Sequence, residues 1–444
     1  MRPQAAICGA PAEPPWQEAH PEKGLLTGSM DKKAEKGIMG TAEGSPALNR
    51  SEGSPKMKKT ACFVLVLVCI LLCGCALANV AIDGSAFPDP ALRRIADQAD
   101  TNRDGILSKA EAGRVKSIDY NGKAAEGPAG LEYFPRLETL TIADDKLTSL
   151  TLRDHPSLKT IYCNENQVQE VTLANLPSLQ DVNLYKNQIT SITLENLPKL
   201  ERLFCPNNQI TEIGLSGAPR LKSLEISDNL LKQIDLSMLP SLTNVNVSMN
   251  QLTEIDVSSN PKLTCLSCIG NGITQLDLDK CRQLEVIYCS LNQITSLDVS
   301  GCARLKDFAC AGNRISGIDL SKNKVLEMLH ISDNLLTELD VSRNTKLTSL
   351  DTDSCAIETL TLGKLPALER LNCSRNRLTA LDVSKCAALK TLLCYENQLT
   401  ELDVGGCKKL ECLRCSENQL TELDLSKNPK LEDLSTDKSV NVIR

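Results

Sequence analysis

The fold is decided by residues 389–409, which read LKTLLCYENQLTELDVGGCKK. The same 21-residue frame restarts fifteen times without an insertion or a deletion. A fixed period of this size is typical of a solenoid, in which each coil packs on the next one. The coils start at Leu137, Leu158, Leu179, Leu200, Leu221, Leu242, Leu263, Leu284, Leu305, Leu326, Leu347, Leu368, Leu389, Leu410 and Leu431.

Each coil carries the hydrophobic pattern of a short strand. Counted from these leucines, apolar residues recur at positions 1, 4, 6, 11, 14 and 16. Positions 4 and 6 flank an outward-facing residue, which is the period of a β-strand. Strands stacked in register at about 4.8 Å each predict a parallel sheet roughly 70 Å long. No segment within a coil has the length of a helix. We therefore expect a second short strand or turns around positions 13–17, on the other face of the coil.

Two polar positions also recur. Position 9 is Asn in twelve coils, and a polar side chain that points into an apolar interior must be hydrogen-bonded. We therefore predict a structural column of Asn side chains. At position 15 we expect each Asp to accept a hydrogen bond from a nearby turn N–H or from the Ser at position 17, and the alternative is a column of bound cations. These residues are Asp235, Asp256, Asp277, Asp298, Asp319, Asp340, Asp382, Asp403 and Asp424.

The motif Leu-x-x-Leu-x-(Cys/Leu)-x-x-Asn-x-Leu-x-x-Leu-Asp-(Leu/Val) resembles the leucine-rich repeat superfamily from Leu137 to about Lys438, within a repeat domain of residues 137–444. In its 21-residue form it resembles the bacterial subclass called IRREKO repeats, in internalin-like proteins. The resemblance implies a repeat solenoid that curves with its sheet on the concave face. It further implies binding of a protein or a glycan and no enzymatic activity. The alternatives are a surface protein that acts by self-association and the targeting part of an enzyme or toxin.

Charge and cysteine usage narrow the interpretation. The net charge of -7 argues against nucleic acid as a partner, which would require a basic stripe. Of the 20 cysteines, most of those in the repeats lie at positions 6 and 19, where other coils carry Leu, Ile, Val or Asn. Because these places follow the repeat, we predict free, buried thiols that act as small apolar fillers. The alternative is a disulfide framework.

The chain before the repeats predicts export. Residues 1–56 are rich in Pro, Gly, Ser and Ala, and we expect a disordered leader or an over-extended reading frame. Residues 57–78 have the basic start, the short apolar run and the small residues of a signal peptide. The stretch before Cys75 also resembles a bacterial lipobox, which implies a lipid anchor on Cys75 in place of cleavage after Ala78. Both routes predict a secreted or surface protein, with membrane contact only through that anchor.

Residues 79–136 are expected to form a small helical head that caps the repeats. Residues 87–99 predict a helix, and residues 100–111 follow the pattern of an EF-hand calcium loop, with Gly105 at its sharp turn. Secreted relatives of the repeat family often carry such a head, so we predict a structural Ca²⁺, bound at roughly 10⁻⁴ to 10⁻³ M. The alternative is a polar loop that binds nothing. The expected ligands are Asp100, Asn102, Asp104, the backbone carbonyl of Ile106, Ser108 through a water molecule, and Glu111.

The side chains that a leucine-rich repeat presents on its concave face define the candidate binding surface. Exposed rings mark such surfaces because they bury a large area at low entropic cost. We predict that Tyr162, Tyr185 and Phe204 form one patch, with Tyr288 and Tyr395 as weaker additions. The alternative is that aromatic rings simply suit a pleated surface.

Coil 11 breaks the repeat at three positions. Thr352 lies at a core position, Cys355 replaces Asn, and Thr361 replaces Asp. The nearby charged residues could build a metal or catalytic site, but solvated charges on a sheet are the more common arrangement. These residues are His330, Asp333, Asp351 and Asp353.

Overall fold

The structure is a computed structural model that describes residues 79–120, 129–142 and 146–444. The predicted leader, the signal peptide and Cys75 lie outside the described residues. The described residues belong to one compact unit, Leu77–Arg444. Among them, no helix has the length and apolar character that a membrane crossing requires.

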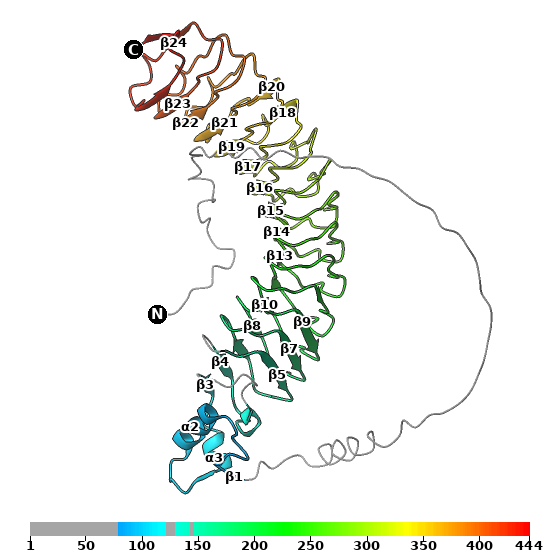
Figure 1. The fold of residues 1–444 in the computed structure, drawn as a ribbon. Helices are drawn as coiled ribbons and strands as arrows, with labels where there is room; N and C mark the ends of the chain where they lie inside the picture. Colours follow the sequence, from blue (N-terminus) through cyan, green and yellow to red (C-terminus); the bar gives the residue numbers. More distant parts are fainter. Residues whose placement is uncertain (1–78, 121–128, 143–145) are drawn as a thin grey trace, which may run out of the picture. The chain divides into compact units, whose positions relative to one another are not determined.

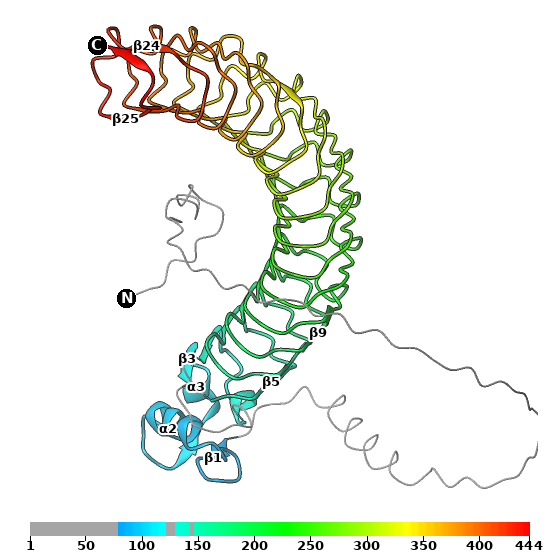
Figure 2. The same cartoon turned by 45° about the horizontal axis from the view of Figure 1, so that its top comes forward.

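The predicted solenoid of about fifteen coils is confirmed. One parallel sheet of 16 strands runs along it in chain order, on the inner side of the curve (Figures 1 and 2). Its strands are β3 (Ser117–Tyr120), β4 (Thr139–Ile142), β6 (Thr160–Tyr162), β8 (Asp181–Asn183), β10 (Arg202–Phe204), β12 (Ser223–Glu225), β13 (Asn244–Asn246), β14 (Cys265–Ser267), β15 (Val286–Tyr288), β16 (Asp307–Ala309), β17 (Met328–His330), β19 (Ser349–Asp351), β21 (Arg370–Asn372), β22 (Thr391–Leu393), β23 (Cys412–Arg414) and β25 (Asp433–Ser435).

The strands stack because equal positions of neighbouring coils pair with each other. Arg202 pairs with Ser223 and Phe204 with Glu225, each 21 residues further along the chain. The middle residue of each strand points inward, and Leu203 and Leu224 are almost fully buried. A leucine in such a site typically contributes about 1.5 to 3 kcal/mol of burial free energy. The repeated leucines therefore supply the core that no single coil could form alone.

The other face contains strands in only some of the coils. Five-residue strands occur in the first three coils, where position 15 is Thr. In the coils with Asp, the carboxylate accepts the N–H of position 17 at 2.8–2.9 Å, as Asp256 does from Ser258, and this turn ends any outer strand at the Asp. The predicted bonding of the Asp column is therefore confirmed. The outer strands are β5 (Ser149–Arg153), β7 (Glu170–Ala174), β9 (Ser191–Glu195), β11 (Glu212–Ile213), β18 (Glu338–Asp340), β20 (Thr359–Thr361), β24 (Glu422–Asp424) and β26 (Asn441–Ile443).

The predicted Asn column at position 9 is also confirmed. The amide of Asn229 donates to the carbonyl oxygens of Cys205 in the preceding coil and Ile226 in its own coil, at 3.1 and 3.2 Å. Its side-chain oxygen accepts the backbone N–H of Ile210 at 2.9 Å. Both halves of the amide are therefore used, and the side chain joins adjacent coils.

Position 8, one residue before this Asn, adopts a left-handed backbone conformation in coils 2 to 14. Glycine occupies it twice, as Gly270 and Gly312, and the other residues there have φ between 52° and 58°. The position 8 N–H donates to the carbonyl of position 7 in the next coil, as Met249 does to Ile269 at 2.7 Å. The stacking thus imposes this conformation on whichever residue the sequence places there.

The head consists of two helices and a small sheet before the first coil. Helix α2 (Pro90–Ala99) begins later than the predicted residue 87, because Asp89 caps it by accepting the N–H groups of Ala91 and Leu92. The other carboxylate oxygen of Asp89 accepts the hydroxyl of Tyr120 in β3 at 2.6 Å. Helix α3 (Lys109–Ala112) follows, and β1 (Val80–Ala81) pairs with β2 (Ile106–Leu107). A short 3-10 helix, η1 (Leu131–Tyr133), leads into the repeats.

Candidate functional site

The predicted calcium loop wraps around Asp100. This carboxylate accepts the N–H of Arg103 at 2.7 Å and the N–H of Gly105 at 2.9 Å. Both donors lie in the left-handed region, with φ of 60° and 76°. The side chains of Asn102 and Asp104 accept further backbone N–H groups inside the loop. Backbone N–H groups of the loop thus hold its shape by donating to the side chains of Asp100, Asn102 and Asp104.

Glu111, the last predicted ligand, is engaged within the protein. Its carboxylate accepts the hydroxyl of Ser108 at 2.6 Å and the hydroxyl of Thr101 at 2.8 Å, and it also accepts both backbone N–H groups. These bonds, that of the Ser108 hydroxyl first, lower the pKa of Glu111 to about 2. The contribution of this carboxylate to folding is therefore complete above pH 4.5, the ordinary value, and is lost as the pH falls toward 2.

The loop has the oxygen donors that Ca²⁺ requires, in the right order along the chain. Their side chains do not converge on one point in this structure. Within residues 79–120, 129–142 and 146–444, no three acidic, His or Cys side chains gather as they would around an ion. Glu111 would have to exchange its bonds to Thr101 and Ser108 for the ion. Strand β1 covers the loop at Ile106, since Ala81 pairs with that residue. The loop is therefore supported on one edge without a second EF-hand.

The predicted aromatic residues lie together on the inner sheet. Tyr162 ends β6 and Phe204 ends β10, and Asn183 of β8 separates them in the register. The rings of Tyr185 and Phe204 contact each other, with centroids 6.2 Å apart and a tilt of 50°. Tyr162 is 42% exposed, the other two are half-buried, and the three are named the aromatic patch below. Its role in binding stays a prediction.

The two weaker aromatic candidates lie apart from this patch and have partners of their own. The hydroxyl of Tyr288 donates to Asp307 at 2.6 Å, and burial raises the pKa of that carboxyl. Tyr395 is half-buried, and its backbone carbonyl accepts the N–H of Arg375 at 2.9 Å. The structure therefore does not join Tyr288 or Tyr395 to the aromatic patch.

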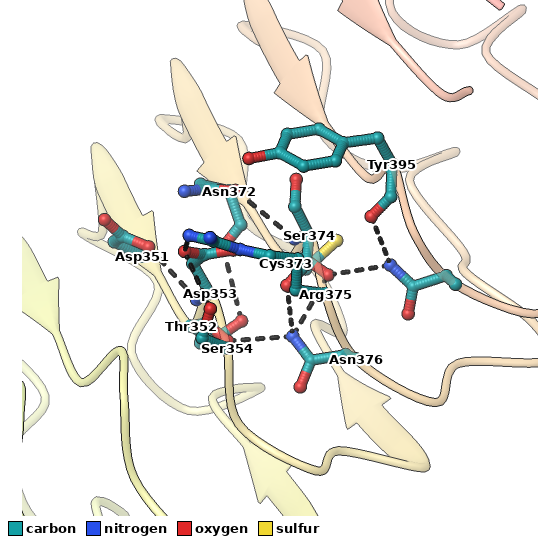
Figure 3. Close-up of polar contacts among 11 residues, drawn as sticks. Asp351, Thr352, Asp353, Ser354, Asn372, Cys373, Ser374, Arg375, Asn376 and Tyr395 are labelled. Atoms are coloured by element: carbon teal, nitrogen blue, oxygen red, sulfur yellow. Dashed lines mark hydrogen bonds and ion pairs between the residues drawn. The ribbon is translucent and has the colours of Figure 1, made fainter. Parts of the chain in front are cut away.

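The irregular coil 11 is explained by local bonding (Figure 3). The guanidinium of Arg375 forms a two-pronged ion pair with Asp353, whose N–H donates to Asp351 at 3.1 Å. The hydroxyl of Thr352 donates to the carbonyl of Asn372 at 3.3 Å. The thiol of Cys355 donates to the carbonyl of Ile331 at 3.4 Å, in place of an Asn amide. Since Asp353 is neutralised by Arg375, a metal or catalytic site here is not supported within the described residues.

The repeat cysteines are free thiols, as predicted. Thirteen of the fifteen described cysteines are buried, and none of the fifteen forms a disulfide. Burial raises their pKa, to about 12 for Cys268 and well above the usual value for Cys289. At position 19 the interpretation as apolar filler is incomplete, because Cys281 and Cys407 each donate the S–H to a carbonyl of the preceding coil at 3.4 Å.

One surface was not predicted from the sequence. Met249 and Leu291 are 51% and 58% exposed, and both occupy the left-handed position 8. The signal was present in the repeat alignment, since position 8 is mostly polar or charged and becomes apolar or Gly only in coils 6 to 9. This column contains no aromatic residue, so the exposed rings did not indicate it.

Comparison with known proteins supports the fold. No protein-family model and no curated protein matches the chain. Among solved structures, the functional domain of InlJ from Listeria monocytogenes, described as including a cysteine ladder, is 27% identical, with a TM-score of 0.66 over 80% of this chain and 78% of that one. The internalin inlF of the same species is 21% identical, with a TM-score of 0.54 over 82% of this chain and 98% of that one.

Neighbours of the same fold also occur outside Listeria. A leucine-rich repeat protein from Leptospira interrogans is 21% identical, with a TM-score of 0.56 over 74% of this chain and 97% of that one. These solved structures share the leucine-rich repeat architecture. The chain therefore has a leucine-rich repeat fold similar to those of these bacterial proteins.

Proposed function

We propose that the chain is an exported bacterial leucine-rich repeat protein that binds a protein or glycan through the inner face of its sheet. The aromatic patch is the observation that carries this proposal. Its three side chains come from adjacent coils, two of the rings contact each other, and Tyr162 remains largely open to solvent. Such rings anchor partners because few rotatable bonds are frozen on binding. The predicted signal peptide and the internalin-like neighbours support a location outside the cell.

The test is an array of proteins and glycans probed with the chain beside a triple variant, Tyr162→Ala, Tyr185→Ala and Phe204→Ala. A partner of the patch should bind the variant roughly tenfold or more weakly, since ring removal at a binding centre costs at least about 1.4 kcal/mol. Met238→Ala is the control, because Met238 is 62% exposed at position 18, away from the inner sheet. Equal binding by all three proteins would exclude the patch as the site.

The same proposal includes a structural Ca²⁺ in the head. Asp100, Asn102, Asp104 and Glu111, with the Ile106 carbonyl and a water molecule on Ser108, would hold the ion and so lock α2 to α3. Calorimetry at millimolar Ca²⁺ is expected to show binding, and Glu111→Gln should weaken it at least tenfold by removing the carboxylate charge and one of its two oxygen ligands. Asp97→Asn on α2, outside the loop, is the matched control. No heat, or the same affinity in both variants, would identify a polar loop without an ion.

A further inference from the structure

We infer that the position 8 column from coil 5 to coil 10 is a docking strip for an apolar protein segment that carries a basic residue near each end. The strip consists of Asp228, Met249, Gly270, Leu291, Gly312 and Asp333. It lies just beyond the ends of strands β12 to β17, and it shares no residue with the aromatic patch. The inference therefore does not depend on the proposed role of that patch.

The first argument is conformational. Met249 has φ of 53° and Leu291 has φ of 56°, in a region that large apolar side chains rarely adopt. Elsewhere the column uses charged or small polar residues, including Asn207 with φ of 56°. Both apolar side chains are more than half exposed, so they gain little from burial. An unfavourable backbone combined with an unfavourable exposure indicates selection for contact with another molecule.

The second argument is the shape that the two glycines create. A Cβ atom on Gly270 would lie 2.3 Å from the sulfur of Met249, and one on Gly312 would lie 2.9 Å from Cδ2 of Leu291. Each glycine therefore makes room for the apolar side chain of the preceding coil to lie along the stack. Large apolar residues alternate with glycines along the strip, so its surface is low, continuous and apolar. Met is also adaptable in shape, as befits a surface that receives another chain.

The third argument is the low charge of the surroundings. At position 7 of the same coils the residues are Ser or apolar, and position 10 carries one charge, on Arg314. Leu230 and Leu335, also at position 10, are 40% and 57% exposed and widen the apolar surface at its two ends. The other polar side chains at these two positions, four Ser and the two residues Gln251 and Gln293, are uncharged. A protein segment with apolar side chains fits this surface better than a glycan does.

The ends of the strip determine the charge of the partner. Asp228 and Asp333 are exposed, and neither forms an ion pair with another described residue. They lie five coils apart, or roughly 24 Å at the spacing of a parallel sheet. A helix of about 16 residues spans this distance. Basic side chains at both ends of such a segment would pair with the carboxylates of Asp228 and Asp333. The same two carboxylates would repel an anionic membrane.

The experiment is selection of a phage-displayed library of random 16-residue peptides on the full chain. Selected clones should have an apolar centre and Lys or Arg toward both ends. They should bind the double variant Met249→Asn, Leu291→Asn at least tenfold more weakly. Asn adopts the left-handed conformation readily, so this variant is expected to unfold at the same or a higher temperature. Lost affinity with retained stability separates a binding role from a structural one.

Two further variants fix the location and the charge rule. The double variant Asp228→Lys, Asp333→Lys should weaken the same clones at least tenfold, whereas Met238→Asn and the aromatic-patch triple variant should leave them unchanged. The inference is overturned if no clone is enriched, or if the enriched clones bind the Asn variant as well as the parent chain. Clones that depend on Met249 and Leu291 but lack basic ends would overturn the stated partner chemistry.

Discussion

The solenoid contains two internal polar columns that use the same residue differently. In coils 3 to 14 each Asn at position 9 both donates and accepts, as Asn229 does with Cys205, Ile226 and Ile210. At position 19 the amide of Asn344 donates to the carbonyls of Leu320 and Asn323 at 3.0 and 2.9 Å, and its own oxygen is buried without a partner. Only an amide satisfies the first column, whereas the second accepts donors such as Asn and Cys and also the apolar side chains of Leu and Ala.

This difference explains why the two columns vary so unequally. Position 9 is Asn in twelve coils, but position 19 is Asn, Cys, Leu, Ala or His. Cys407 donates to Val383 as Asn428 donates to Val404, so thiol and amide exchange there. The number of hydrogen bonds that a buried side chain makes, more than its polarity, therefore limits which residues can replace it.

The largest effect is expected from Asn229→Ala at position 9. The substitution leaves the Ile210 N–H buried without an acceptor and removes the amide bonds to two carbonyls, which should cost about 3 kcal/mol. Urea unfolding followed by circular dichroism measures the loss, and Lys232→Ala on the exposed surface of the same coil is the control. A loss below about 1 kcal/mol would contradict the distinction between the two columns.

The opposite substitution, to Asn, is possible in coil 11, the one coil from 2 to 14 without Asn at position 9. In coil 11, Cys355 supplies a donor but no amide oxygen, so the position 11 N–H of the preceding coil, on Leu336, lacks the usual acceptor. Cys355→Asn should restore it and stabilise the chain by about 1 kcal/mol. Hydrogen exchange at Leu336 should slow in the same variant. Faster exchange or lower stability would show that coil 11 has repacked around its thiol.

A smaller effect is expected at position 19. Asn344→Cys keeps one donor to a carbonyl, and both carbonyls retain backbone partners in Asn323 N–H and Leu326 N–H. The free energy of unfolding should therefore change by less than about 0.5 kcal/mol. Asn334→Cys, at position 9 of the same coil, is the matched comparison. Similar losses for the two variants would remove the proposed difference between the columns.

Alkylation should show almost no effect on the buried thiols of either cysteine position. Burial raises the pKa of Cys289 at position 6 and of Cys302 at position 19, the latter to about 11, so both remain protonated at pH 8. Among the fifteen described cysteines, mass spectrometry after brief treatment with iodoacetamide should find Cys412, which is only half-buried, labelled before the buried ones. Rapid labelling of Cys289 in the folded chain would indicate local opening of the coils.

The period of 21 residues was sufficient to predict the coils, the inner sheet and the Asn column, because each follows from where apolar and polar side chains must point. It could not predict which coils form an outer strand, because coils 10 and 14 form β18 and β24 although they carry Asp at position 15 like neighbouring coils without an outer strand. The site was harder to predict. The sequence placed Tyr162 and Phe204 in one column of the sheet, but it did not reveal that Tyr288 is bonded to Asp307 or that Glu111 is bonded to Ser108.

Because the coils stack in register, distances along the inner sheet are set by the number of coils. Every coil meets the next through the same positions, so one repeat of 21 residues can be gained or lost without altering the interfaces on either side. Each such event would move everything beyond it by roughly 4.8 Å along the inner sheet. The separation between the aromatic patch and the position 8 strip is therefore a property of coil number, which duplication within a gene can change in equal steps.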